Sequence, residues 1–130
     1  MAILSEYIGA VFVAFLWGTT NPLIRQAACS RTQSRDIAGN YYGKRLIWQL
    51  WEIIRYWPFS IPFAVNQIAS LLYMWVLTKL PVTVAVPLVN SLTFVFTELT
   101  GRMLGEKGNH TVIIGAILIV IGAAITVLAD

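Results

Sequence analysis

The sequence predicts an all-α, polytopic membrane protein in which residues 1–130 form a single four-transmembrane-helix bundle. Of its 130 residues, 58% are hydrophobic and 12% are charged, and the mean hydropathy is +0.73. Such a composition leaves too little polar surface to coat a water-soluble globule. Four apolar stretches of bilayer-spanning length occupy most of the chain. We therefore expect almost no soluble domain.

The first predicted span covers residues 7–28. It has no charge before Arg25, and Pro22 near its end predicts a kink. Residues 1–6 contain no Lys or Arg, whereas a secretory signal opens with basic residues. We therefore expect a retained span and not a cleaved signal.

The connection at 29–57 has two halves. The first is rich in Ser, Thr and Arg and reaches Gly39 and Asn40, which predicts a loop. From Lys44 to Trp57, apolar residues recur at helical spacing among several Trp and Tyr residues. This pattern predicts an amphipathic helix in the headgroup layer, between the first and second spans. The alternative is that the segment extends the second span.

The remaining predicted spans cover residues 58–78, 80–103 and 111–129. Lys79 and the two residues after it allow only a tight turn, so we expect the second and third spans to be antiparallel neighbours. Residues 102–110 form the last predicted turn.

The basic residues are divided unequally between the connections. The first and third connections hold Arg25, Arg31, Arg35, Lys44, Arg45, Arg55, Arg102 and Lys107. The second holds only Lys79. Because Lys and Arg in short loops stay cytoplasmic, both termini are predicted to be outside or lumenal, in an organelle that the sequence does not specify. A glycan on the sequon at Asn109 would contradict this orientation.

Polar side chains inside spans usually turn toward a helix interface or a water-filled cavity. Asn66, Ser70 and Tyr73 share one face of the second span. The candidates for a polar pathway are Trp17, Thr20, Asn21, Asn66, Gln67, Ser70, Tyr73, Asn90, Ser91 and Glu98. The alternative is that they only join helices, because Asn, Ser and Thr commonly do so in membranes.

Glu98 is a carboxylate within a span, which makes it a functional candidate. Arg102 lies four residues later, so an ion pair at the membrane edge explains Glu98 equally well.

The fourth span has a nearly smooth face made of Gly115, Ala116, Gly122 and Ala123. Small residues allow close backbone approach, so this face predicts helix packing. It is also a candidate surface for a homodimer or a hetero-oligomer.

Other classes of function find no support in the sequence. Cys29 is the only cysteine, so neither an internal disulfide nor a cysteine–histidine metal site is expected. No glycine-rich phosphate loop, aspartate pair or other catalytic motif is present, so we expect no enzyme and no cofactor. The basic residues flank apolar spans, which favours contact with membrane lipid over nucleic acid.

Four groups of residues resemble the transmembrane protein 234 family. They are Phe15, Leu16, Trp17, Gly18, Thr19, Thr20, Asn21 and Pro22; Asn66, Gln67, Ala69, Ser70, Leu71, Leu72 and Tyr73; Val86, Pro87, Asn90, Ser91 and Leu92; and Leu104, Gly105 and Glu106. That family is similar to the drug/metabolite transporter superfamily. Its EamA-type halves end much as residues 87–126 do here.

The resemblance implies one half of a transporter that moves an unknown small molecule. Larger relatives carry ten spans in two inverted halves, so a complete pathway here needs a second copy or a partner. Small multidrug exporters use a glutamate within the first span, whereas Glu6 precedes that span. A drug antiporter of that kind is therefore not expected. The alternative to transport is a membrane scaffold or accessory subunit.

Overall fold

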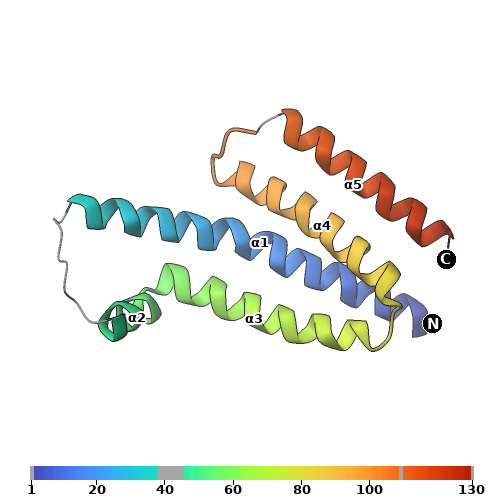
Figure 1. Cartoon of the computed structure of the whole chain (residues 1–130), viewed down its shortest axis with the longest axis horizontal. Helices are drawn as coiled ribbons and strands as arrows, with labels where there is room; N and C mark the ends of the chain where they lie inside the picture. The colour runs from blue at the N-terminus through green and yellow to red at the C-terminus, as the bar shows by residue number, and fades with distance from the viewer. Residues whose placement is uncertain (1, 38–45, 109, 130) are drawn as a thin grey trace.

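The computed structural model describes residues 2–37, 46–108 and 110–129, and these are almost entirely helical (Figure 1). The helices are α1 (Ala2–Ile37), α2 (Leu46–Arg55), α3 (Trp57–Leu77), α4 (Val82–Met103) and α5 (His110–Ala129). No strand occurs within these ranges. The all-α prediction is confirmed.

Three helices are long and apolar enough to cross a membrane: α1 over Ser5–Arg31, α3 and α4. α5 is apolar over the shorter stretch His110–Thr126. An apolar segment of about 20 residues spans a bilayer as a helix because the helix closes its own backbone hydrogen bonds. The chain therefore has three or more membrane-spanning helices.

α1 is the central helix, with α3 packed on one side of it and α4 on the other. Figure 1 shows this order, with α5 on the far side of α4. α3 and α4 run antiparallel through the tight turn at residues 78–80, but they touch each other very little. The prediction that these two spans pack as neighbours is therefore wrong, because α1 lies between them.

Small residues on α1 explain its central position. Ala10 and Ala14 are fully buried, in one cluster with Val76 of α3 and with Ala85 and Val89 of α4. Within a membrane, helices associate through close packing and not through the hydrophobic effect, so small side chains that let backbones approach favour contact. α1 offers such residues to both neighbours.

Gly18 marks the closest approach between α1 and α4. A Cβ atom at this position would lie 2.3 Å from Phe96 Cβ and 2.9 Å from the carbonyl oxygen of Thr93. No side chain fits there. Beside this contact, the rings of Phe15 and Phe96 meet edge to face with centroids 5.4 Å apart.

α1 is longer than predicted. It continues through Pro22 and through residues 29–37, which were predicted to be loop. Ser30 Oγ donates to the carbonyl oxygen of Gln26 at 2.9 Å, so this hydroxyl is satisfied within the helix. Arg31 pairs with Glu52 of α2 at 3.4 Å and lies over the ring of Tyr56. These contacts hold the polar end of α1 in helical form, whereas Gly39 and Asn40 lie outside the described residues.

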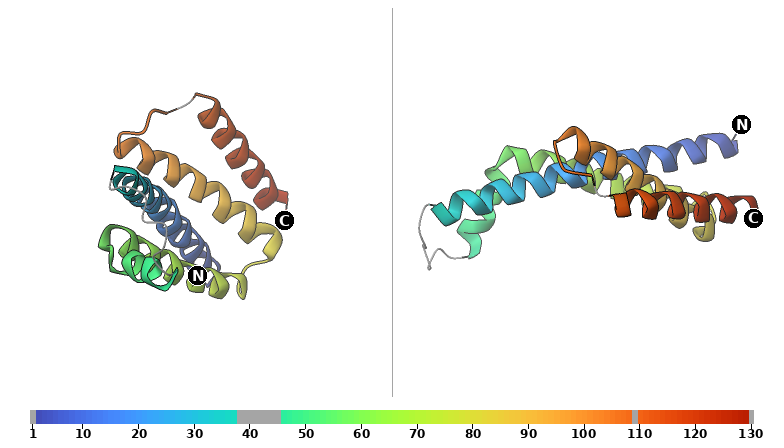
Figure 2. Two further views of the ribbon diagram at one scale, coloured as in Figure 1. Left: turned by 60° about the vertical axis from the view of Figure 1, so that its left-hand side comes forward. Right: turned by 90° about the horizontal axis from the view of Figure 1, so that it is seen from above.

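α2 is a helix of its own and does not extend α3. Tyr56 interrupts the two helices with an extended backbone, φ −82° and ψ 94°. α2 turns sharply away from the axis of α3 (Figure 2). Its aromatic residues Trp48 and Trp51 and the neighbouring Ile54 are exposed, as expected for a segment that contacts lipid headgroups. Lys44, where the predicted segment begins, lies outside the described residues.

The connections lie at two opposite ends of the bundle. The start of α1, the end of α5 and the α3–α4 turn lie together at one end (Figure 1). α2 and the α4–α5 connection lie toward the other end. Both termini are thus on the same side, and Lys79 lies with them.

Candidate functional site

A hydrogen-bonded cluster joins α1 and α3. The amide Nδ2 of Asn66 donates to Thr20 Oγ1 at 2.9 Å and to Asn21 Oδ1 at 3.0 Å. In return, the indole Nε1 of Trp17 donates to the carbonyl oxygen of Asn66 at 3.3 Å. One asparagine thus connects to three residues of the neighbouring helix.

Local sequence explains how α1 holds these partners. Thr20 is buried and its hydroxyl donates to the carbonyl oxygen of Leu16 at 2.7 Å. The oxygen of that hydroxyl is therefore left to accept from Asn66. Asn21 follows Thr20 directly and is exposed. Asn66 therefore bonds to one buried and one exposed residue of α1.

The same face of α3 contributes two further residues. Ser70 Oγ donates to the carbonyl oxygen of Asn66 at 3.1 Å. The rings of Tyr73 and Trp17 pack with centroids 5.0 Å apart at a tilt of 59°. The spacing of Asn66, Ser70 and Tyr73 over two helical turns brings all three toward α1.

The other four candidate residues lie elsewhere. Gln67 is exposed on α3 and Asn90 is exposed on α4. Ser91 is buried, and its hydroxyl donates to the carbonyl oxygen of Leu88 at 2.9 Å. Glu98 lies near the end of α4, where it accepts from Arg102 Nε at 3.0 Å. Because α1 separates α3 from α4, the polar residues of these two helices do not converge in one chain.

A charged site occupies the end of the bundle where α4 stops. Gly105 has a φ of +86°, which glycine adopts freely, and it ends α4. The backbone N–H of Glu106 then donates to the carbonyl oxygen of Gly101 at 3.0 Å. This turn brings the Glu106 carboxylate to the guanidinium of Arg25, with which it forms an ion pair.

Sequence reasoning did not predict the pair between Arg25 and Glu106. Only one indication in the sequence places them near each other: both belong to connections predicted on the same side of the membrane. A cavity of about 360 Å³ opens beside the pair. Its walls are Arg25, Phe94, Thr97, Glu98, Glu106, Lys107 and Val112.

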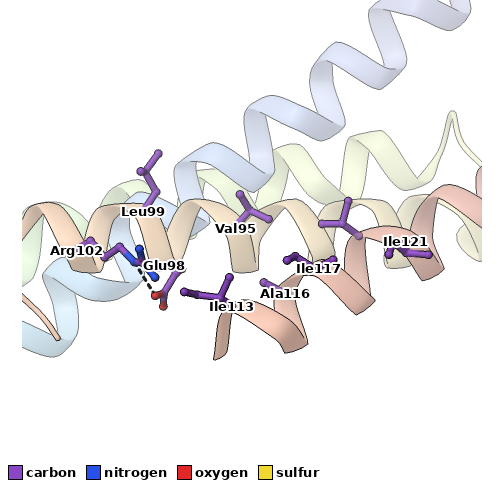
Figure 3. Close-up of a pocket in the computed structure, with 9 residues that line it drawn as sticks. Val95, Glu98, Leu99, Arg102, Ile113, Ala116, Ile117 and Ile121 are labelled. Carbon is purple, nitrogen blue, oxygen red and sulfur yellow. Dashed lines mark hydrogen bonds and ion pairs between the residues drawn. The ribbon is translucent and has the colours of Figure 1, made fainter. Parts of the chain in front are cut away.

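An apolar groove runs between α4 and α5 and has a volume of about 400 Å³. Figure 3 shows its lining, with the Glu98–Arg102 pair at one end and apolar side chains along both helices. The residues of the predicted small-residue face of α5 do not all pack against α4. Ala116 and Ala123 are buried, whereas a Cβ atom at Gly115 or Gly122 would meet nothing within 4 Å.

The sites differ in the chemical groups that they offer. Among the described residues, no group of three or more His, Cys, Asp or Glu side chains is placed to hold a metal ion. The α1–α3 cluster offers neutral hydrogen-bonding groups. The end of the bundle offers charges of both signs.

Comparison with known proteins gives a consistent match. The chain matches the model of transmembrane family 234 over residues 10–127. It is 32% identical over 123 residues to a transmembrane protein 234 homolog of Anopheles gambiae, which covers 91% of this chain and 83% of the relative. It is 34% identical over 124 residues to the homolog of Dictyostelium discoideum, with 92% of each chain covered. No solved structure matches.

Proposed function

The chain belongs to transmembrane family 234, and from that membership we propose that this integral, multi-pass membrane protein is one half of a transport unit. It resembles one half of an EamA-like drug/metabolite transporter. In the proposal, α5 is the fourth span and both termini face outside or the lumen. Two copies, or this chain and a partner, together move a small metabolite.

The observation that carries the proposal is the exposure of two amides in mid-helix. Gln67 lies near the middle of α3 and Asn90 near the middle of α4, and both are exposed in the single chain. In a lone chain these amides would face hydrocarbon, where an unpaired amide costs several kcal/mol. A second subunit that encloses a water-filled path would remove that cost at both positions.

The α1–α3 cluster supports the same proposal. Both amide protons of Asn66 are used by Thr20 and Asn21, but among the described residues no donor reaches its Oδ1 atom. Asn66 is half-buried, so this acceptor remains accessible. It is a candidate contact for a polar substrate.

Uptake into proteoliposomes tests the proposal. Purified protein is reconstituted and offered a library of labelled metabolites, with empty liposomes as the reference. We expect uptake of at least one compound. Asn90→Leu should lower that uptake about tenfold or more, since it removes a polar group from the path. Thr126→Val is the matched control, because within the described structure the Thr126 hydroxyl donates only to the carbonyl oxygen of Gly122, in its own helix.

Water access gives a second readout. Cysteines placed at Asn66, Ser70 and Asn90 on a Cys29→Ser background should all react with a polar maleimide in the reconstituted protein. Protection at all three positions, together with no uptake of any metabolite, would contradict transport and favour a scaffold. Glu98→Gln tests whether that carboxylate acts in transport or only pairs with Arg102 at the membrane edge. Unchanged folding and unchanged uptake would leave only the second role.

A further inference from the structure

The groove between α4 and α5 is apolar along its length and open on one side. Val95 and Leu99 of α4 and Ile113, Ile117 and Ile121 of α5 line it. Leu99 is 55% exposed and Ile117 is 53% exposed, so the described chain leaves about half of each side chain uncovered. In a bilayer this surface meets lipid, and its volume of about 400 Å³ is that of a small-molecule pocket.

The groove ends at the charged cavity. Glu98 lines both spaces, and the first turn of α5 separates them, with Ile113 on the apolar side and Val112 on the charged side. The apolar groove and the charged cavity thus adjoin at one end of the bundle. A phospholipid has the same division, since an acyl chain continues into a charged headgroup.

The charges at this end favour an anion. Arg25 is neutralised by Glu106 and Arg102 by Glu98. Among the described residues, no acidic group pairs with Lys107, which is exposed on the cavity wall. α5 also begins here, at His110, and Val112 of its first turn lines the cavity, so the positive end of the α5 helix dipole lies beside this space. The three cations and two carboxylates leave a net positive charge.

We propose that the groove between α4 and α5 binds one phospholipid with an anionic headgroup. One acyl chain lies along Val95, Leu99, Ile117 and Ile121. The phosphate lies at the start of α5, within reach of Lys107. The site does not depend on transport, since it is separated from the α1–α3 cluster by α4. A second copy of the chain would match the apolar groove, but it would not explain Lys107 at its end, a cation with no acidic partner in the part of the chain that the structure describes.

Native mass spectrometry tests the headgroup. The protein, purified in detergent, is titrated with phosphatidylglycerol or with phosphatidylcholine of the same acyl chains. We expect one bound lipid per chain, with phosphatidylglycerol favoured about tenfold. Lys107→Gln should reduce that preference about threefold or more. Lys79→Gln, at the opposite end of the bundle, should leave it unchanged. Equal binding of both lipids, or equal effects of the two substitutions, would overturn the headgroup assignment.

A second pair of variants tests the groove. Ile117→Trp places a large ring in it and should lower binding of both lipids about fivefold. Ile114→Trp is the matched control, because Ile114 is 60% exposed on α5 and does not line the groove. Equal lipid binding by these two variants would overturn the site. A dimer of the wild-type chain that carries no lipid and that Ile117→Trp dissociates would show that a second copy occupies the groove instead.

Discussion

The side-chain amide of Asn66 on α3 donates a hydrogen bond to the hydroxyl of Thr20 on α1 at 2.9 Å. The two residues are 46 positions apart in the chain, and Thr20 is one of two polar residues among the buried side chains of the described structure. With the packing of Tyr73 on Trp17, this bond turns one face of α3 toward the central helix. Gln67, one position after Asn66, stays exposed.

Asn66→Ala should lower the free energy of unfolding by about 1 kcal/mol, because each hydrogen bond between membrane helices contributes about 0.6 kcal/mol and two are lost. The unfolding midpoint in mixed micelles measures this change. Gln67→Ala is the matched control, since Gln67 is adjacent but exposed. A loss as large for Gln67→Ala as for Asn66→Ala would contradict the assigned role of the cluster.

Gly18→Ala should destabilise the protein by about 2 to 3 kcal/mol, at the upper end for an added methyl group. The new methyl would overlap Phe96 Cβ and the backbone of α4, which must then move away from α1. Gly122→Ala is the control, because the space around Gly122 is open and alanine favours helix. The prediction fails if both variants unfold at the same temperature.

Arg25→Glu should lower the unfolding midpoint, because it places a carboxylate beside Glu106. The pair is partly exposed, so the expected loss is about 0.5 to 1 kcal/mol. The exchange Arg25→Glu with Glu106→Arg should recover most of it, whereas Lys79→Glu at the other end should change little. Failure of the exchange to recover stability would show that Arg25 acts through contacts other than Glu106.

Cys29 serves as a native reporter of orientation, because it is the only cysteine and is exposed on α1. In intact cells, a membrane-impermeant maleimide should not label Cys29 of protein at the cell surface until the membrane is permeabilised. Ser5→Cys on a Cys29→Ser background should be labelled without permeabilisation, since residue 5 is near the opposite end of α1. The reverse pattern would place both termini in the cytosol.

Much of the fold follows from the sequence, and the reasons are local. Helices α3, α4 and α5 begin and end within about two residues of the segments predicted as the second, third and fourth spans, because charged residues and Pro81 flank these apolar stretches. The separate helix α2 was also predicted correctly, from the period of its apolar residues. The predicted loop at 29–37 was wrong because Ser, Thr and Arg are also accommodated in a helix that has tertiary partners.

The candidate site was predicted only as a set of residues and not as an arrangement. Trp17, Thr20, Asn21, Asn66, Ser70 and Tyr73 do lie together. Asn90 does not join them because α1 lies between α3 and α4, and the polar pattern of a single helix does not encode that order. Gln67 does not join them because it lies on the exposed face of α3. In the proposed assembly, a second subunit encloses Gln67 and Asn90 in the bilayer.

The sequence by itself determined that this chain is helical and lies in a membrane, because an apolar run in lipid must close its hydrogen bonds within its own backbone. It also determined, to within about two residues, where α3, α4 and α5 begin and end, but not that α1 continues to Ile37. Only the tertiary structure decided that α1 is central and that Glu106 returns to Arg25. Those features depend on how side-chain shapes fit between helices that are distant in sequence. At Gly18, α1 and α4 come close because Gly18 has no side chain to meet Phe96, and the spacing of residues along one helix does not predict such a contact.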